Sequence, residues 1–289
     1  MSIQVKNLTH IYEKGMPNES IALENISFEV EDGSFLGVIG HTGSGKSTLL
    51  QHLNGLLKPT EGTIVIGGVD ITSPEVSMVD IRKRIGLVFQ YPEYQLFEET
   101  VAKDVAFGPK NLGLNKEEIE ERVKEAIELV GLDYEAIKDR SPFELSGGQK
   151  RRVAIAGVVA MRPEVLILDE PTAGLDPKAH KDVLKMVEKV HEKTGNIIIL
   201  VSHNMADIAR MSDKVLVIDS GHMVMMGTPK EVFSRREELA KVGLDLPPIT
   251  QLTENLRKNG LDIEDTILSV DEAAEQIAKY LKDKENDKC

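Results

Sequence analysis

The sequence predicts an α/β protein with a mainly parallel sheet, an antiparallel β layer, a helical subdomain and a small α-helical C-terminal extension. Short apolar runs typical of buried strands alternate with segments of helical periodicity, a pattern that favours a parallel sheet with helices on both faces. A glycine-rich segment connects one of these runs to a helix. Beyond about Arg236 the strand-like runs stop, and only two short amphipathic segments follow.

The expected elements follow the chain in this order. Residues 4–30 predict short strands, and the apolar run 35–39 predicts a buried strand. The apolar spacing of 46–57 and 117–130 predicts two amphipathic helices. Further strands are expected at 63–66, 87–89, 165–168, 197–201, 215–218 and 223–226, and further helices at 147–161, 178–193, 249–258 and 271–281. In the last helix we expect Ala274, Ile277 and Leu281 to form one face.

These patterns predict two parts of unequal size. Residues 1–236 form one α/β domain, in which about 91–162 make up the helical subdomain, and residues 237–289 form the C-terminal extension. Pro247 and Pro248 mark a bend between the two parts, because each proline restricts the residue before it. The motifs described below are not repeated, so the chain holds one copy of the machinery they define.

Composition disfavours several classes of function. The net charge of −13 and the pI of about 5.1 argue against a nucleic-acid binder and against direct adsorption to anionic lipid. The longest apolar stretch, 153–161, is far shorter than the roughly 20 residues of a membrane span, and the first thirty residues lack a signal-peptide pattern. We therefore expect a cytoplasmic protein that a protein partner holds at any membrane. The single cysteine, Cys289, excludes an internal disulfide.

The glycine-rich segment matches G-x-x-x-x-G-K-[ST], the phosphate-binding loop of P-loop NTPases. It consists of Gly40, His41, Thr42, Gly43, Ser44, Gly45, Lys46 and Ser47. Its backbone N–H groups and the helix that follows would surround the phosphates of ATP. Lys46 would bridge the β- and γ-phosphates, Ser47 would bind Mg²⁺, and Thr48 would support it. ATP and Mg²⁺ are therefore the expected cofactors.

Two adjacent carboxylates, Asp169 and Glu170, end a predicted buried strand. Ligands gather at the carboxyl ends of parallel strands, and paired carboxylates there are costly unless a cation uses them. We assign Asp169 to the Mg²⁺ shell and Glu170 to orienting the water that attacks the γ-phosphate. One well-placed carboxylate suffices for this reaction, because phosphoryl transfer depends mostly on positioning and charge neutralisation.

The sequence Leu-Ser-Gly-Gly-Gln at 145–149 lies before a basic helical segment, and we interpret it as a second anion-binding helix N-terminus. One nucleotide does not need two such sites from one subunit. The order of these motifs resembles that of the ATP-binding-cassette ATPases, in which Leu-Ser-Gly-Gly-Gln is the signature. The resemblance implies that Ser146, Gly147, Gly148 and Gln149 contact the ATP bound by a second cassette, either an identical chain or a paralogue.

The resemblance extends to four further positions. Tyr12 matches the aromatic residue that stacks on adenine, and Gln90 matches the glutamine that contacts Mg²⁺ and water. Asp176 lies in a loop similar to the one through which two cassettes communicate, and His203 matches the histidine that senses the γ-phosphate. Glu170, His203 and Gln90 are thus the expected catalytic residues. Ser47, Gln90 and Asp169 are the expected metal ligands, and the complete set implies an active ATPase.

Residues 90–97, 99–109 and 141–144 are similar to the energy-coupling-factor branch of importers, whose ATPases serve membrane proteins that take up vitamins or transition-metal ions. This implies a peripheral protein at the cytoplasmic face of the cell membrane. Its direct partner would be a membrane coupling protein, and a substrate-binding membrane protein would be an indirect partner. Residues 91–105 would dock the membrane coupling protein through an apolar strip with an acidic rim of Glu93, Glu98, Glu99 and Asp104. The extension in this branch is linked to dimer contacts. Two alternatives remain. One is the ATPase subunit of another cassette transporter, either an exporter or a different importer, and the other is a soluble cassette ATPase.

Overall fold

The computed structural model describes residues 1–286, and Cys289 lies outside this range. Its strands form a four-stranded antiparallel sheet in the order β2-β1-β4-β5 and a six-stranded sheet in the order β10-β9-β3-β8-β7-β6. The first sheet contains β1 Ile3–Tyr12, β2 Ser20–Val30, β4 Glu61–Ile66 and β5 Val69–Asp70. The second contains β3 Phe35–Ile39, β6 Ile85–Val88, β7 Val165–Asp169, β8 Ile197–Val201, β9 Lys214–Asp219 and β10 His222–Gly227.

The six-stranded sheet is parallel except for its edge strand β10, which pairs antiparallel with β9. Strand β3 lies between β8 and β9, and β7 lies between β8 and β6. The register places Val38 opposite Val201, and Asp169 also opposite Val201. The carboxyl ends of β3, β7 and β8 therefore lie at one level along the same edge.

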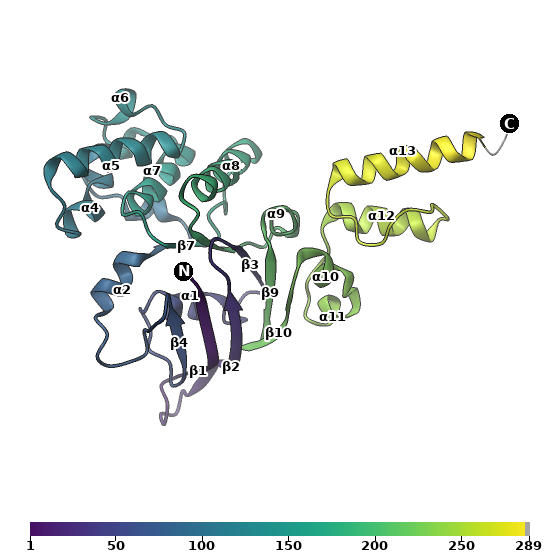
Figure 1. Cartoon of the computed structure of the whole chain (residues 1–289), viewed down its shortest axis with the longest axis horizontal. Coiled ribbons are helices and arrows are strands. Elements are labelled where there is room, and N and C mark those ends of the chain that lie inside the picture. The colour runs from purple at the N-terminus through teal and green to yellow at the C-terminus, as the bar shows by residue number, and fades with distance from the viewer. Residues whose placement is uncertain (287–289) are drawn as a thin grey trace.

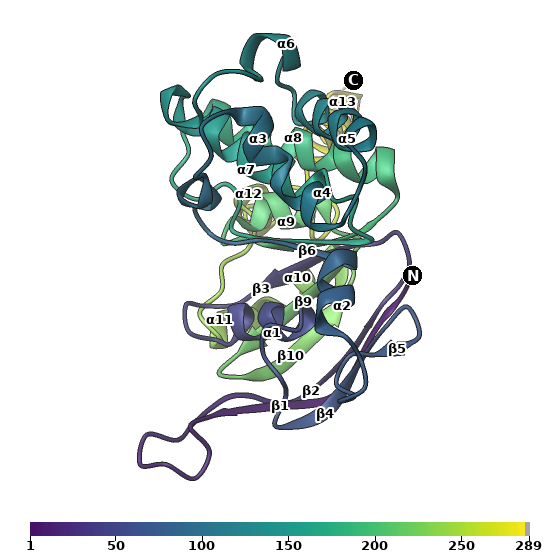
Figure 2. The ribbon, with the colours of Figure 1, turned by 90° about the vertical axis from the view of Figure 1, so that its left-hand side faces the viewer.

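Helices occupy both faces of this sheet (Figure 2). The longer helices are α1 Lys46–Leu53, α5 Lys116–Leu129, α7 Gly147–Val159, α8 Pro177–Thr194, α12 Pro248–Lys258 and α13 Val270–Asn286. The shorter ones are α2 Met78–Arg84, α3 Val101–Val105, α4 Phe107–Asn111, α6 Tyr134–Ile137, α9 Met205–Met211, α10 Pro229–Ser234 and α11 Arg236–Lys241, with 3₁₀ turns η1 Pro92–Gln95 and η2 Pro142–Glu144. Helix α1 lies between the two sheets, whereas α5, α7 and α8 cover the opposite face (Figure 2).

The core is divided by the parallel sheet. One apolar cluster fills the space between the two sheets and includes Leu49, Leu50 and Leu53 of α1. The other fills the opposite face, where Val153 and Ala156 of α7 are fully buried. Alternate residues of β7 and β8 enter the two clusters, as expected for strands covered on both faces. This double burial fixes the strand ends that carry the polar residues of the site.

The last two helices lie on the far side of the molecule from α4, α5 and α6 (Figure 1). Ile263, Ile267 and Ala273 form a small apolar cluster there, separate from the main core. The predicted face of α13 is wrong at two of its three positions, because Ala274 and Leu281 are exposed and only Ile277 is half-buried. The face that packs inward instead includes Ala273 and Tyr280, and the Tyr280 hydroxyl donates to the carbonyl of Gly260 at 3.1 Å.

The predicted fold class is confirmed in its parallel sheet, antiparallel layer and flanking helices. Helix α1 ends earlier than predicted, because the chain turns at Asn54 and Gly55, where Gly55 has φ +68°. The short helices α3, α4, α6, α9, α10 and α11 were not predicted, since four to seven residues are too few to show a helical period. Among residues 1–286, no helix combines the length and the apolar character needed to cross a membrane.

Candidate active site

The polar residues singled out in the sequence lie at the carboxyl edge of the parallel sheet. The phosphate-binding loop follows β3, Asp169 ends β7, His203 follows β8, and Gln90 follows β6. Side chains that are far apart in sequence, such as Ser47 and Asp169, are thereby brought within hydrogen-bond distance. Open α/β sheets bind ligands at this edge, so the topology places a candidate nucleotide site here.

The phosphate-binding loop fits tightly between two backbone segments. A Cβ atom on Gly40 would lie 2.2 Å from the carbonyl oxygen of Ile218, and one on Gly45 would lie 2.6 Å from that of Ala22. Gly45 also has φ +105°, a conformation that favours glycine. The His41 ring contacts Asp219 at 2.7 Å through its Nε2 atom, which ties the loop to the end of β9. These contacts hold the loop in shape at the start of α1.

The Lys46 ammonium group lies in the concave side of the loop. It donates to the carbonyls of Gly40 and His41, both at 2.8 Å. Burial lowers the pKa of Lys46, while the charges of Glu170 and Asp169 oppose that shift. A buried cation held by neutral carbonyls is well suited to a polyanion, because phosphate oxygens would supply the missing negative charge.

Ser47 and Asp169 form the second polar pair of the site. The Ser47 hydroxyl donates to Asp169 Oδ2 at 3.1 Å. Burial raises the pKa of the Asp169 carboxyl, and the hydrogen bond from Ser47 works against the shift. A hydroxyl and a carboxylate side by side are hard oxygen donors of the kind Mg²⁺ prefers, with its other positions left to water and phosphate. The residues present therefore fit a magnesium ion.

Glu170 is the centre of the hydrogen-bond network. Its Oε2 atom accepts from Gln90 Nε2 at 3.2 Å, and its Oε1 atom lies 2.7 Å from His203 Nε2. Its backbone has φ +49°, which a side-chain-bearing residue rarely adopts and which is common at functional positions. The network joins the ends of β6, β7 and β8 at one carboxylate, which can hold a water molecule next to the phosphate-binding loop.

Tyr12 lies at the end of β1, beside the first turn of α1. Its hydroxyl is 3.3 Å from the Thr48 Oγ1 atom, and its side chain is partly exposed. The structure thus brings the predicted aromatic residue to the same helix that begins at the phosphate-binding loop. An aromatic ring at this distance along α1 can cover a base attached to the bound phosphates.

The signature residues begin α7. Ser146 caps this helix and accepts from the backbone N–H of Gln149 at 3.3 Å, while Gln149 Oε1 accepts from the backbone N–H of Ser146 at 3.0 Å. Gly147 is open, since a Cβ atom there would have no neighbour within 4 Å. The free N–H groups at this helix start and its positive dipole end can receive an anion.

Asp176 lies beside the signature rather than beside the phosphate-binding loop. The two segments line one open pocket of about 400 Å³, together with Gly174 and Lys178. Asp176 Oδ1 caps α8 and accepts from the backbone N–H groups of Lys178 at 2.9 Å and Ala179 at 3.0 Å. These N–H groups lower the pKa of the Asp176 carboxyl.

The predicted residues therefore form two separate groups. The phosphate-binding loop, Asp169, Glu170, Gln90 and His203 form one, and the signature with Asp176 forms the other. Within residues 1–286, no hydrogen bond or ion pair joins positions 145–149 to the loop. Each chain thus presents two separate candidate sites for an anion.

The segment 91–105 is built differently from the predicted acidic rim. Glu93 is directed inward and forms a two-point ion pair with Arg151, whose side chain is fully buried. Asp104 accepts from the backbone N–H groups of Phe97 and Glu98, both at 2.9 Å. These two carboxylates are used within the fold, and Glu99 pairs with Lys103 at 2.6 Å, so the outer rim is reduced to Glu98 and the Glu99–Lys103 ion pair. The sequence did not indicate that Glu93 pairs with Arg151, because the two residues are 58 positions apart.

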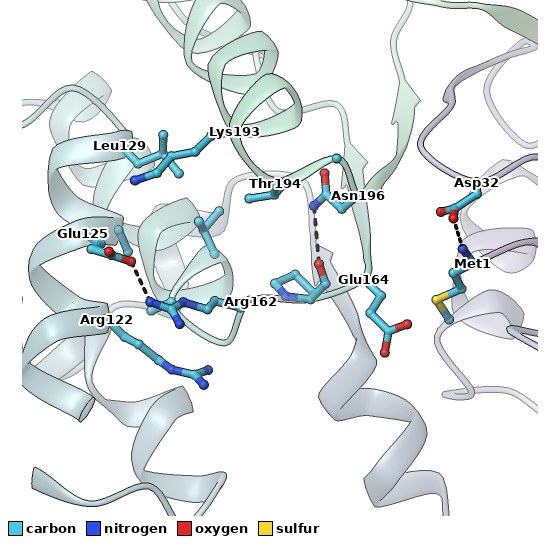
Figure 3. A pocket seen from close by; sticks show the side chains of 15 residues that line it. Met1, Asp32, Arg122, Glu125, Leu129, Arg162, Glu164, Lys193, Thr194 and Asn196 are labelled. Carbon is cyan, nitrogen blue, oxygen red and sulfur yellow. Dashed lines mark hydrogen bonds and ion pairs between the residues drawn. The ribbon is translucent and has the colours of Figure 1, made fainter. Parts of the chain in front are cut away.

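A cavity of about 490 Å³ lies at the opposite edge of the sheet (Figure 3). Asp32, Glu164 and Asn196, which line it, come directly before or near the amino ends of β3, β7 and β8. Arg162 pairs there with Glu125 at 2.7 Å. Its position at the amino ends of the strands separates this cavity from the candidate active site.

The comparison with known proteins agrees with this geometry. The family model described as ABC transporter matches residues 23–173, and the chain belongs to the ATP-binding-cassette (ABC) transporter ATPases. Its relatives include the energy-coupling factor transporter ATP-binding protein EcfA2 of Caldanaerobacter subterraneus subsp. tengcongensis, 58% identical over 286 residues that span 99% of this chain and 100% of the relative. EcfA2 of Clostridioides difficile is 58% identical over 283 residues, 98% of each chain.

Solved structures show the same fold. CbiO1 from Clostridium perfringens, part of the ABC transporter complex CbiONQ, matches with a TM-score of 0.74 and 40% identity and covers 87% of this chain and 98% of its own. The ATP-binding cassette MJ0796, in a dimeric post-hydrolysis state with ADP and Pi, matches with a TM-score of 0.69 and 28% identity over 78% of this chain and 98% of its own. The predicted membership of the energy-coupling-factor branch of the cassette ATPases is confirmed.

Proposed function

We propose that the chain is the ATP-hydrolysing subunit of an energy-coupling-factor importer, and that it acts at the cytoplasmic face of the cell membrane. One observation carries the proposal: Gln90 and His203 both hold the Glu170 carboxylate beside the Ser47–Asp169 pair and the phosphate-binding loop. This arrangement supplies the polar groups that phosphoryl transfer needs. The relatives named energy-coupling factor ATP-binding proteins support transport rather than a soluble role.

The residues of the loop bind and orient the nucleotide. The backbone of residues 40–45 and the start of α1 receive the phosphates. Lys46 leaves its carbonyl partners, Gly40 and His41, to bridge the β- and γ-phosphates. Ser47, Asp169 and Gln90 would hold Mg²⁺, which when bound neutralises charge on the phosphate oxygens. Tyr12 stacks on the adenine ring, and Thr48 supports its hydroxyl.

Glu170 accepts a proton from the attacking water while Gln90 and His203 fix its carboxylate. Removal of the γ-phosphate then alters the contacts of His203, whose Nε2 atom lies 2.7 Å from Glu170 Oε1. A general base contributes mainly by placing the nucleophile within hydrogen-bond reach. The left-handed backbone of Glu170 keeps its side chain at the strand end, where the γ-phosphate arrives.

A second cassette completes the site. Ser146, Gly147, Gly148 and Gln149 of one cassette close on the ATP of the other, and Asp176 contributes across the same interface. The partner is an identical chain or a paralogue. ATP favours the closed pair because its phosphates contact both chains, and hydrolysis removes that preference. Dimeric cassette structures such as that of MJ0796 support this assembly.

The membrane coupling protein docks near residues 91–105. Beside this segment lies a cavity of about 510 Å³, lined by apolar side chains that include Leu96, Phe97, Phe107 and Met161. The rings of Phe97 and Phe107 meet edge to face at 5.0 Å and remain about half exposed. A helix of the coupling protein can insert its apolar face here, with a cation near Glu98.

The other partners follow from this placement. The cassette reaches the substrate-binding membrane protein only through the coupling protein, and vitamins or transition-metal ions are the substrate classes implied. The C-terminal extension, residues 237–289, contributes contacts to the second cassette. No nucleic-acid partner is proposed, because the net charge of −13 disfavours phosphate backbones.

Replacement of Glu170 by Gln tests the catalytic assignment. The variant keeps the size and the hydrogen-bonding reach of the side chain but cannot accept a proton from water. We expect it to bind ATP and to form a stable pair in ATP, with turnover lowered about 100-fold or more. Turnover is measured as phosphate release and pairing as mass by light scattering. Turnover at the parent rate would show that Glu170 is not the base.

A further inference from the structure

Two histidines are buried next to the proposed adenine platform. His10 on β1 is 8% exposed and His52 on α1 is 1% exposed. The His10 Nδ1 and His52 Nε2 atoms are 3.1 Å apart, and the two ring centroids are 4.5 Å apart. Neither residue belongs to the ATPase motifs, so the proposed mechanism leaves this pair without a role.

The surroundings fix which nitrogen of each ring carries the proton. His52 Nδ1 lies 2.7 Å from the carbonyl oxygen of Thr48, and a carbonyl can only accept, so Nδ1 of His52 donates. In the neutral ring, His52 Nε2 is then an acceptor, and His10 Nδ1 must donate to it. Burial lowers the pKa of both rings, which favours this neutral arrangement.

The pair belongs to a closed ring of contacts among four residues, which are His10, Tyr12, Thr48 and His52. His10 and Tyr12 are two positions apart on β1, and their side chains lie together although the register of β1 with β2 shifts between His10 and Ile11. Their rings meet edge to face with centroids 4.5 Å apart. The Tyr12 hydroxyl contacts Thr48 Oγ1, and the Thr48 carbonyl accepts from His52, which completes the closed ring of contacts back to His10.

We infer that the His10–His52 pair positions Tyr12 for the nucleotide base, and that it does so by fixing β1 to the helix that carries the phosphate-binding loop. The Tyr12 side chain is held at its hydroxyl by Thr48 and at its ring by His10, and 38% of it remains exposed. A ring fixed before binding loses little conformational entropy when a base stacks on it. The pair is therefore a positioning element for base recognition, and it does not contact the phosphates.

The inference rests on the proposed role of Tyr12 and makes a selective prediction. A loss of the His10–His52 hydrogen bond should weaken ligands that carry a base and spare those that carry phosphates alone. A buried hydrogen bond contributes roughly 0.5–1.5 kcal/mol, which corresponds to about a 2- to 10-fold change in affinity. A merely structural pair would weaken both kinds of ligand equally, since it would act through the shape of the loop.

The test uses the full chain with ADP, which is not hydrolysed, and with inorganic tripolyphosphate, which has no base. His10→Phe keeps an aromatic ring against Tyr12 but removes the donor to His52. We expect the ADP dissociation constant to rise about 2- to 10-fold. The dissociation constant of tripolyphosphate, measured in competition with fluorescent ADP, should be unchanged. In turnover assays the KM for ATP should rise while kcat is retained.

His52→Asn is the second variant. Its amide can still donate toward the Thr48 carbonyl but offers no second ring nitrogen to His10. The double variant should weaken ADP no more than the stronger single variant, because both changes break the same hydrogen bond. His191→Phe is the matched control, since His191 also contacts a carbonyl, that of Asn196 at 2.9 Å, and packs edge to face on Phe35. It should leave both ligands unchanged.

Equal weakening of ADP and tripolyphosphate, or unchanged ADP binding in both variants, would overturn the inference. Tyr12→Ala separates this outcome from a failure of the proposed site. If Tyr12→Ala weakens ADP but the histidine variants do not, the base assignment stands and the positioning role is wrong. If Tyr12→Ala leaves ADP binding unchanged, the base assignment itself is wrong, and the positioning role with it.

Discussion

Arg151 shows how one buried side chain can join several functional segments. Its guanidinium donates to both oxygens of Glu93, at 2.7 and 2.6 Å, and to the carbonyls of Pro171 and Ala173, both at 2.9 Å. It thereby connects α7, which begins with the signature, to the turn after Gln90 and to the loop after Glu170. The ring of Tyr91 lies 5.5 Å from the guanidinium and adds a cation–π contact.

We predict that Arg151→Leu destabilises the fold by about 3–5 kcal/mol, because it leaves the Glu93 carboxylate buried without a partner. Arg162→Leu is the matched control, since its ion pair with Glu125 is about half exposed and should cost at most about 1 kcal/mol. Chemical denaturation of the two variants measures the difference. An equal loss of free energy of unfolding in the two variants would contradict the claim that the buried contacts of Arg151 hold these segments together.

At this scale, the sequence located residues that a local pattern defines, whose roles stay predictions, and it missed contacts that packing defines. The sequence identified Asp169, Glu170 and His203 because each follows a recognisable apolar strand. It did not identify the contacts of Arg151 or His52, because their partners lie 58 and 42 positions away and no local pattern specifies a pair at such distances. A weak signal existed for His10, which is two residues from Tyr12, the spacing at which side chains of a regular strand share a face.

Among the elements, the turn η1 and the short helix α3 separate the site from the proposed docking cavity. Gln90 lies directly before this segment, and Leu96 and Phe97 line the cavity. A partner helix that moves η1 would also move Gln90 and, through Arg151, the start of α7. The elements here were poorly predicted, because four- and five-residue helices are set by capping contacts such as that of Thr100 with the Lys103 N–H rather than by periodicity.

The docking proposal predicts a charge effect at Glu98. We expect Glu98→Lys to reduce recovery of the membrane partners with the cassette several-fold, because a cation on the partner would meet a like charge. ADP binding by the isolated chain should be unchanged. Glu192→Lys, an exposed reversal on α8, is the control for net charge. Unchanged recovery in affinity purification from membranes would remove Glu98 from the interface.

For the whole molecule, the parallel sheet was the most predictable feature and the C-terminal part the least. Buried strands such as β7 and β8 are apolar on both faces, so their runs are unmistakable in the sequence. The small cluster around Ile267 offers few apolar residues, and a shift of one position rotates the buried face of α13 by about 100°. The division of the chain at 236 and 237 stays a prediction.

The central claim is that one cassette completes the nucleotide site of another. Gly147 gives a direct test, because a side chain there meets no atom of its own chain within 4 Å and should leave the fold intact. The measurement is ATP turnover by Gly147→Asp, paired with the second cassette of its transporter or with itself. The account predicts normal ADP binding by the phosphate-binding loop of the variant chain. It also predicts loss of turnover at the nucleotide site that the variant's signature covers, since a carboxylate repels the γ-phosphate. Full turnover by this variant as a monomer would contradict it.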